Sequence, residues 1–528
     1  MMAIGLPNPS QAVNARPRNE SSITINTIGG NSNSWGGNTY SGSSITNNSQ
    51  DFYGDWRSAD SWQRFDIFRV RNRSRQLERG NPWCIAYGRN MVNNVLGAAG
   101  FRFKVQSVTS KAFGDSTEGQ LDDSANAIIH AAIDEQGKPE NFETRKRLSR
   151  EDFDELLLRR WIFDGEVILR KMRGFNNDCG FAWQMIDPDY LDHNLNRVEP
   201  NGNIIKMGIE LDAEFKFPVA YWFLKRRPND YFYNYNKFYQ QRYFRVPAEE
   251  VIHIFQQEAD SEQTRGWPWI FSAVVNLHRQ GKFEEAALVN AAIGASRGIY
   301  FTKDYPEGFE SNPDDINRQG DISQVIPAGS AMELPVGVKP VVADMRYPDA
   351  EFEPFRNAMM LGAAACFGTS YSTTTGDLSK ANFVSSRMGQ LEEREFFKRI
   401  QQILIRRWKV PGFDEELYRA MLAGRVPLPI SKFKKFNKPQ FRGRRWPFVQ
   451  PVDDMKAIEM KLNNRLTSVP MVIEEFSEDD PDEVLASIAL WEKKAAALGV
   501  QRILQVPPSA VTEDDELVKE PTAPKKSA

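Results

Sequence analysis

Several signatures of common protein classes are missing from this chain of 528 residues. It has only three cysteines, an odd and widely spaced set that predicts buried thiols rather than a disulfide framework. It has no run of about 18 apolar residues, so we expect no membrane-spanning helix and no membrane partner. The first residues have neither a basic start nor an apolar core, and no secretory signal is expected there.

Catalytic and metal-binding motifs are missing as well. The chain has no Gly-x-x-x-x-Gly-Lys-Ser/Thr phosphate loop, no CxxC pair, no Gly-x-Ser-x-Gly elbow and no histidines at zinc spacing. His253 lies in an alternating apolar segment, which predicts a packed core residue rather than a ligand. Asp187 and Asp189 flank a proline turn and need no catalytic role. The sequence therefore predicts no catalytic residue, no metal site and no cofactor, and it argues against a hydrolase or packaging ATPase.

What is present is the composition of a large globular protein, with 41% hydrophobic and 26% charged residues. The length exceeds what one hydrophobic core usually supports, so several lobes are expected. The net charge of −3 hides an uneven distribution. Eight basic and no acidic residues lie between Arg425 and Arg445, whereas seven of the ten residues from Glu474 to Glu483 are acidic. Such segregation predicts surfaces that meet different partners.

Periodicity and turn residues divide the first half of the chain. Residues 1–55 are rich in Asn, Ser and Gly, and we expect them to be disordered or ordered only by a partner, while the tail 501–528 is expected to be disordered. Residues 56–262 read as an α+β lobe, and Ser149 with Asp152 predicts a capping box at one of its helices. We expect helices over 57–80, 83–96, 122–136 and 149–163, and strands over 101–105, 165–172, 181–186, 204–211, 219–224 and 246–255.

The second half is predicted to be mainly helical. Helices over 270–296 and 350–367 enclose a small module, 298–349, with expected strands at 299–302, 322–326, 331–335 and 338–342. The polar loop 368–379 has almost no charge, so it can approach a surface without gripping it. Further helices are expected over 380–409, 413–422, 452–465, 468–476 and 481–498. In the helix from Lys380, Met388 and Leu391 share one face, while Phe397 and Ile400 share the opposite one, which predicts a helix that bridges two packing environments.

The stretch Tyr231–Phe244 is aromatic at eight of its fourteen positions, with arginines and a lysine nearby. These side chains could stack on the bases of a single strand. We favour the alternative, a β-hairpin that packs its aromatic residues against a neighbouring subunit, because aromatics are common in strands and interfaces.

Short motifs in a fixed order resemble the lambda-type portal proteins of tailed bacteriophages, over about residues 60–490. Those motifs are Arg79-Gly-Asn-Pro-Trp, Asn90-Met-Val-Asn-Asn-Val-Leu-Gly, Gln184-Met-Ile-Asp-Pro-Asp, Met207-Gly-Ile-Glu-Leu-Asp, Gln263-Thr-Arg-Gly-Trp-Pro, Gly376-Asp-Leu-Ser-Lys-Ala-Asn-Phe and Trp446-Pro-Phe-Val-Gln-Pro. Each is weakly specific alone, and their common order is what makes the resemblance specific.

The resemblance implies a portal-type α+β fold. Its parts would be a wing (56–262), a helical-hairpin stem (263–297 and 350–367), a small β-containing clip (298–349), a tunnel loop (368–379), a long bridging helix with a basic segment of the wing (380–450), and a helical crown (451–500). It also implies a ring, commonly a dodecamer, at one capsid vertex of the virion, assembled in the host cytoplasm. Double-stranded DNA would be packaged and ejected through its channel. The implied partners are other copies of the chain, the major capsid protein, the terminase large subunit and a head–tail adaptor protein.

The resemblance also indicates candidate site residues. The tunnel loop would present hydroxyls and one lysine to DNA, a weak contact suited to sliding, through Thr373, Thr374, Thr375, Asp377, Ser379 and Lys380. Lys380 could instead be a solvated helix residue, and Asp377 is expected to cap the helix from Lys380 rather than touch DNA. A second set would bind DNA or, as we favour, the acidic segment of a neighbouring subunit: Lys432, Lys434, Lys435, Lys438, Arg442, Arg444 and Arg445. The alternative function is a single-stranded nucleic-acid-binding protein that uses residues 226–244.

Overall fold

The computed structural model describes residues 57–108, 121–228, 242–258, 260–295, 299–303, 338–342, 352–379, 383–446, 450–477 and 479–498. Outside this part lie the segments 1–55 and 501–528, most of the aromatic stretch, Lys380, and the strands expected at 322–326 and 331–335. No helix within the described ranges combines the length and apolar character needed to cross a membrane.

Four of the first five helices agree with the sequence pattern, and the short helix over 139–142 was not predicted. The five are α1 (Ala59–Gly80), α2 (Pro82–Val95), α3 (Asp123–Gln136), α4 (Pro139–Phe142) and α5 (Arg150–Asp164). Asn81 separates α1 from α2, and its side-chain oxygen accepts hydrogen bonds from the backbone N–H groups of Trp83 (3.0 Å) and Cys84 (3.2 Å). The predicted capping box of Ser149 and Asp152 is confirmed at the start of α5.

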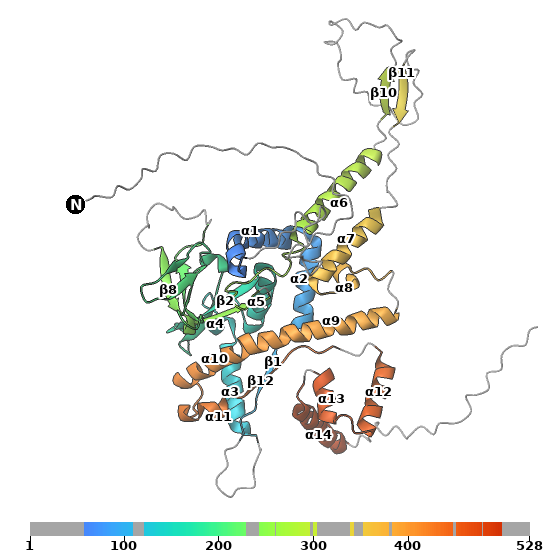
Figure 1. Ribbon diagram of the computed structural model, residues 1–528. Coiled ribbons are helices and arrows are strands. Elements are labelled where there is room, and N and C mark those ends of the chain that lie inside the picture. The colour runs from blue at the N-terminus through green and yellow to red at the C-terminus, as the bar shows by residue number, and fades with distance from the viewer. Residues whose placement is uncertain are drawn as a thin grey trace, which may run out of the picture. The chain divides into compact units, whose positions relative to one another are not determined.

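Two antiparallel sheets follow (Figure 1). In the first, β2 (Glu166–Arg173) lies between β3 (Phe181–Ile186) and β9 (Val251–Phe255). The second takes its strands in sequence order: β4 (Arg197–Val198), β5 (Ile204–Lys206), β6 (Ile209–Leu211), β7 (Pro218–Leu224) and β8 (Tyr243–Pro247). Antiparallel sheets with separate helices define the α+β class that the sequence predicts.

Two expected strands are wrong because each is interrupted. The strand expected over 204–211 is a hairpin of β5 and β6, since Met207 and Gly208 both have positive φ angles (46° and 84°) and reverse the chain. The strand expected over 246–255 changes sheets. After Pro247 a 3₁₀ turn leads out of β8 in the five-stranded sheet and into β9 in the three-stranded one.

The long helix α9 (Phe383–Leu404) runs through a π-helical turn (Ile405–Lys409) into α10 (Val410–Leu422) (Figure 1). The expected gap between the helices 380–409 and 413–422 is wrong, because Pro411 lies in the first turn of α10, where its missing N–H group is tolerated. The sequence predicts that opposite faces of this helix are both buried, and within one chain only one of them is. Phe397 and Ile400 are buried in the main core, whereas Met388 and Leu391 on the other face are 69% and 48% exposed.

The remaining elements are two contacting helices, two pairs of strands and the last helices. Helices α6 (Val274–Ala295) and α7 (Phe352–Phe367) contact each other, and Phe283 of α6 stacks on Phe352 of α7. Between them in sequence, β10 (Ile299–Lys303) pairs antiparallel with β11 (Val338–Val342). Further along, β12 (Pro439–Arg442) pairs with β1 (Arg102–Val105). The last helices are α11 (Phe433–Phe436), α12 (Pro451–Asn463), α13 (Val469–Phe476) and α14 (Pro481–Ala497).

Candidate nucleic-acid interface

The loop 368–379 contains a short helix, α8 (Tyr371–Thr375), which the sequence did not predict. Ser370 caps its start, because the Ser370 hydroxyl accepts a hydrogen bond from the Thr373 N–H at 3.2 Å. Gly376 ends it in the left-handed conformation, with φ of 73°. The four residues from Gly376 to Ser379 therefore form an irregular tip after α8, and Gly368 to Ser370 form the irregular segment before it.

The three threonines predicted to face DNA direct their hydroxyls to protein atoms. Thr373 donates to Glu393 Oε2 at 2.8 Å, and Thr375 donates to the Tyr371 carbonyl at 2.7 Å. Thr374 is only 3% exposed, and its hydroxyl lies 3.0 Å from the Ser370 carbonyl. In this conformation Thr374 has no surface to offer a duplex.

Three of the four residues of the tip, Gly376, Leu378 and Ser379, are exposed. Asp377 Oδ1 accepts hydrogen bonds from the Ser379 N–H (2.9 Å) and the Ser379 hydroxyl (2.6 Å). Leu378, between them, is 67% exposed. Asp377 thus organises the tip itself, and residues 380–382, where the helix that Asp377 was expected to cap would begin, lie outside the described residues.

The basic segment is divided between exposed lysines and paired arginines. Lys432, Lys434 and Lys438 are exposed, whereas Lys435 forms a 2.6 Å ion pair with Asp122. Arg444 donates to the Asn93 carbonyl. Arg445 is half-buried, and burial, with help from the nearby Arg442, lowers its pKa.

Arg442 joins the basic segment to the acidic one within a single chain. It pairs with Asp480 at 3.0 Å and with Glu474 at 3.1 Å, and Lys104 lies 3.2 Å from the same Asp480. Burial by itself raises the pKa of Asp480. The Asp482 N–H, Lys104 and Arg442 outweigh that effect and hold the pKa below its usual range. The pairing that we favoured between neighbouring subunits is therefore made inside the chain, at least by Arg442.

A buried ion-pair network lies inside the α+β lobe. Arg265 is fully buried and binds Glu166 with Nη2 at 2.5 Å and Nε at 2.8 Å. Burial raises the pKa of Glu166, but Arg265 and Arg71 outweigh it and hold the pKa well below its usual value. His253 is buried and lies 3.0 Å from Glu166, which confirms a packed core residue. Asp189, whose pKa Arg71 and Arg75 lower against the opposing effect of burial, belongs to the same network.

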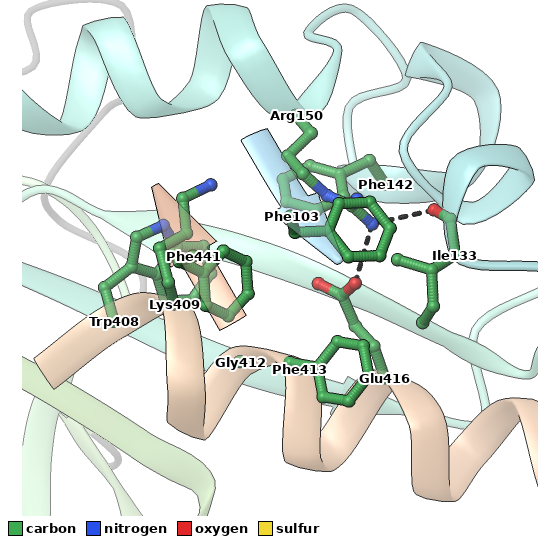
Figure 2. Close-up of a pocket in the computed structure, with 10 residues that line it drawn as sticks. All are labelled: Phe103, Ile133, Phe142, Arg150, Trp408, Lys409, Gly412, Phe413, Glu416 and Phe441. Carbon is green, nitrogen blue, oxygen red and sulfur yellow. Dashed lines mark hydrogen bonds and ion pairs between the residues drawn. The ribbon is translucent and has the colours of Figure 1, made fainter. Parts of the chain in front are cut away.

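A small cavity lies beside the π-helical turn (Figure 2). Its volume of about 20 Å³ admits one water molecule and no organic ligand. Arg150 crosses it and donates to the Ile133 carbonyl and to Glu416 Oε2, both at 2.8 Å. The guanidinium lies near the faces of Phe103 and Phe142, 5.7 and 5.5 Å from the ring centroids. Lys409, the other cation drawn there, pairs with Asp154. Each charged side chain that lines the cavity thus has a structural partner.

Three residues that hold the loop were not recognised in the sequence. Glu393 binds two groups of α8, Asn90 donates to the Thr373 carbonyl at 2.9 Å, and the Tyr371 hydroxyl donates to Asn357 at 2.9 Å. The only available signal for Glu393 was its place between the two apolar faces of α9. Across the described ranges, no group of three or more His, Cys, Asp or Glu residues is arranged to hold a metal ion.

Comparison with known proteins assigns the family. Residues 47–401 match the lambda family of phage portal proteins, and the chain belongs to that family. A probable portal protein of Halomonas phage phiHAP-1 is 31% identical over 435 residues, which cover 82% of this chain and 81% of that protein. This relationship extends over most of the length of both chains.

Solved structures give remote likenesses. A chain from the neck of an empty GTA particle is 14% identical, with a TM-score of 0.39, and the match covers 80% of this chain and 95% of that one. An HK97 family phage portal protein from Corynebacterium diphtheriae is 12% identical, with a TM-score of 0.28, and covers 59% of this chain and 80% of that one.

Proposed function

We propose that the protein forms a homo-oligomeric ring, a dodecamer, at one vertex of a phage capsid. Double-stranded DNA passes through its channel during packaging and ejection. The ring is a non-enzymatic docking site for the terminase large subunit, the major capsid protein and a head–tail adaptor. Membership of the lambda portal family across residues 47–401 is the observation that carries this proposal.

In this proposal the tip from Gly376 to Ser379, together with Lys380, faces the channel. The whole loop 368–379 contains one acidic residue and no lysine or arginine. A channel wall must contact phosphates weakly, because every phosphate neutralised by a fixed cation adds affinity through counterion release and would slow translocation. The internal use of the Thr373, Thr374 and Thr375 hydroxyls leaves the tip as the sliding surface.

Electron microscopy of the purified protein in negative stain tests the ring. We expect closed rings with a central hole, and particles without such a hole would overturn the proposal. The channel role has its own test, the replacement of Leu378 and Ser379 by glycine in a packaging system. Rings should still form while packaging or retention of DNA is impaired. Loss of ring assembly would contradict a pure channel role for the tip.

The alternative, a protein that binds single strands through residues 226–244, makes a different prediction. It requires tight, salt-sensitive binding of a short oligonucleotide by the monomer. Arg227, at the start of this stretch, pairs with Asp187 at 2.7 Å, so part of its charge is already neutralised within the chain. Fluorescence anisotropy with a labelled oligothymidylate decides between the two, because the portal proposal expects no tight binding by the monomer.

A further inference from the structure

The helix α8 is attached to three other helices by side chains. Asn90 of α2 donates to the Thr373 carbonyl, and the Tyr371 hydroxyl of α8 donates to Asn357 of α7. From α9, the Glu393 carboxylate reaches the same short helix. The loop is therefore a fixed body up to Gly376, and its position depends on these attachments.

Glu393 makes the strongest of these attachments. Its Oε1 accepts the Ser370 N–H, and its Oε2 accepts the Thr373 hydroxyl at 2.8 Å, so both carboxylate oxygens are used by α8. The residue is only 7% exposed, and within the described ranges no lysine or arginine forms an ion pair with it. A buried carboxylate without a cation is stable only when strong donors occupy it. Its two donors both come from the loop.

Glu393 also connects the loop to the protein core. One turn further along α9, Phe397 is 3% exposed, and Ile400 behind it is 1% exposed, so this part of the helix is embedded in the main core. A group on α9 therefore has a fixed position relative to the core. By contrast, Leu378 at the tip of the loop is exposed.

We infer that Glu393 is the positioning residue of the loop 368–379. Its carboxylate fixes the start of α8 to α9 and thereby sets how far the tip from Gly376 to Ser379 reaches from the core. This inference rests on the proposed function in one respect, namely that the tip faces DNA. The attachment of α8 to α9 can be tested without DNA.

Hydrogen–deuterium exchange of the full-length protein tests the attachment, with peptides that cover residues 370–379. Glu393→Ala removes both acceptors but keeps a good helix former in α9. We expect exchange at least about tenfold faster in these peptides, since hydrogen bonds to a charged group contribute about 1.4 kcal/mol or more together. Glu393→Gln should lie between wild type and Glu393→Ala, because its amide can accept from Ser370 and donate to the Thr373 oxygen.

The matched control is Glu392→Ala, which changes an exposed glutamate on the neighbouring position of α9. It should leave exchange of the loop unchanged. The inference is overturned if Glu393→Ala exchanges like wild type, if Glu392→Ala reproduces its effect, or if exchange rises equally throughout the protein. Circular dichroism and thermal unfolding establish that Glu393→Ala is folded, so that only the loop is compared.

A packaging assay with the same variants separates this inference from the proposed function. If Glu393→Ala releases the loop and also impairs packaging or retention of DNA, both stand. If the loop is released and packaging is unchanged, the attachment stands and the channel role of the tip fails. If the loop is not released, the attachment fails whatever the packaging result.

Discussion

Replacement of Arg265 by methionine would test whether the buried ion network holds the α+β lobe together. The guanidinium of Arg265 binds Glu166 with two nitrogens and also donates to the carbonyls of Met207 (3.0 Å) and Pro188 (3.2 Å). It therefore joins strand β2, the β5–β6 turn and the segment before α6. Methionine has a similar length but no donor, so the substitution removes the hydrogen bonds that Arg265 donates to all of these acceptors.

The expected cost follows from the burial of the pair. The side chains of Arg265 and Glu166 are 1% and 0% exposed, and removing one partner of such a pair costs about 3–5 kcal/mol. Because Glu166 keeps Arg71 at 2.5 Å and His253 at 3.0 Å, we expect the free energy of unfolding to fall by about 4 kcal/mol and not by more. For a lobe of this size, 1 kcal/mol lowers Tm by roughly 2–4 °C, which gives a decrease of roughly 8–16 °C.

Differential scanning fluorimetry of the purified full-length protein measures this change. The control is Arg425→Met, because Arg425 and Asp178 form an exposed pair that contributes about 0–1 kcal/mol. The double variant with Glu166→Gln should recover part of the loss, since it removes a buried carboxylate that has lost one of its two arginine partners. A decrease for Arg265→Met no larger than that of Arg425→Met would refute the reasoning.

Three further predictions concern single substitutions at His253, Gly165 and Arg442. Burial lowers the pKa of His253 in the folded protein, so its contribution to stability is complete above the unfolded pKa of about 6.5 and is lost as pH falls from there. Tm should therefore fall between pH 7 and 5, and less steeply for His253→Asn. Gly165→Ala should lower the free energy of unfolding by roughly 3 kcal/mol or more in a denaturant titration, because φ at this position is +84° and a Cβ atom would lie 2.1 Å from the carbonyl carbon of Trp267. An unchanged free energy of unfolding would contradict this. Arg442→Ala should change global Tm little but speed hydrogen exchange in α13 and α14, since it removes the pair with Asp480; wild-type exchange there should also rise with salt, and unchanged exchange in the variant would exclude this role for Arg442.

Prediction from the sequence failed at particular points for identifiable reasons. The hairpin at Met207 and Gly208 was missed because Met-Gly is not among the common two-residue turn sequences, although both residues take positive φ. The helix α8 was missed because one turn is too short to show a period, and its residues have low helix propensity. Glu393 could not be distinguished from Glu392 on the same helix, because their difference lies in what each contacts.

The sequence by itself determined the long helices, most strands, the lack of catalytic motifs and the resemblance to portal proteins. These features depend on local periodicity, capping residues and short motifs, all of which involve residues close together in the sequence. Only the tertiary structure decided which partners the polar groups bind. The threonine hydroxyls bind protein atoms, Arg442 pairs with Asp480 of its own chain, and Arg265 pairs with Glu166. The partner of a buried polar group comes from a distant segment, and no local pattern specifies which segment that is.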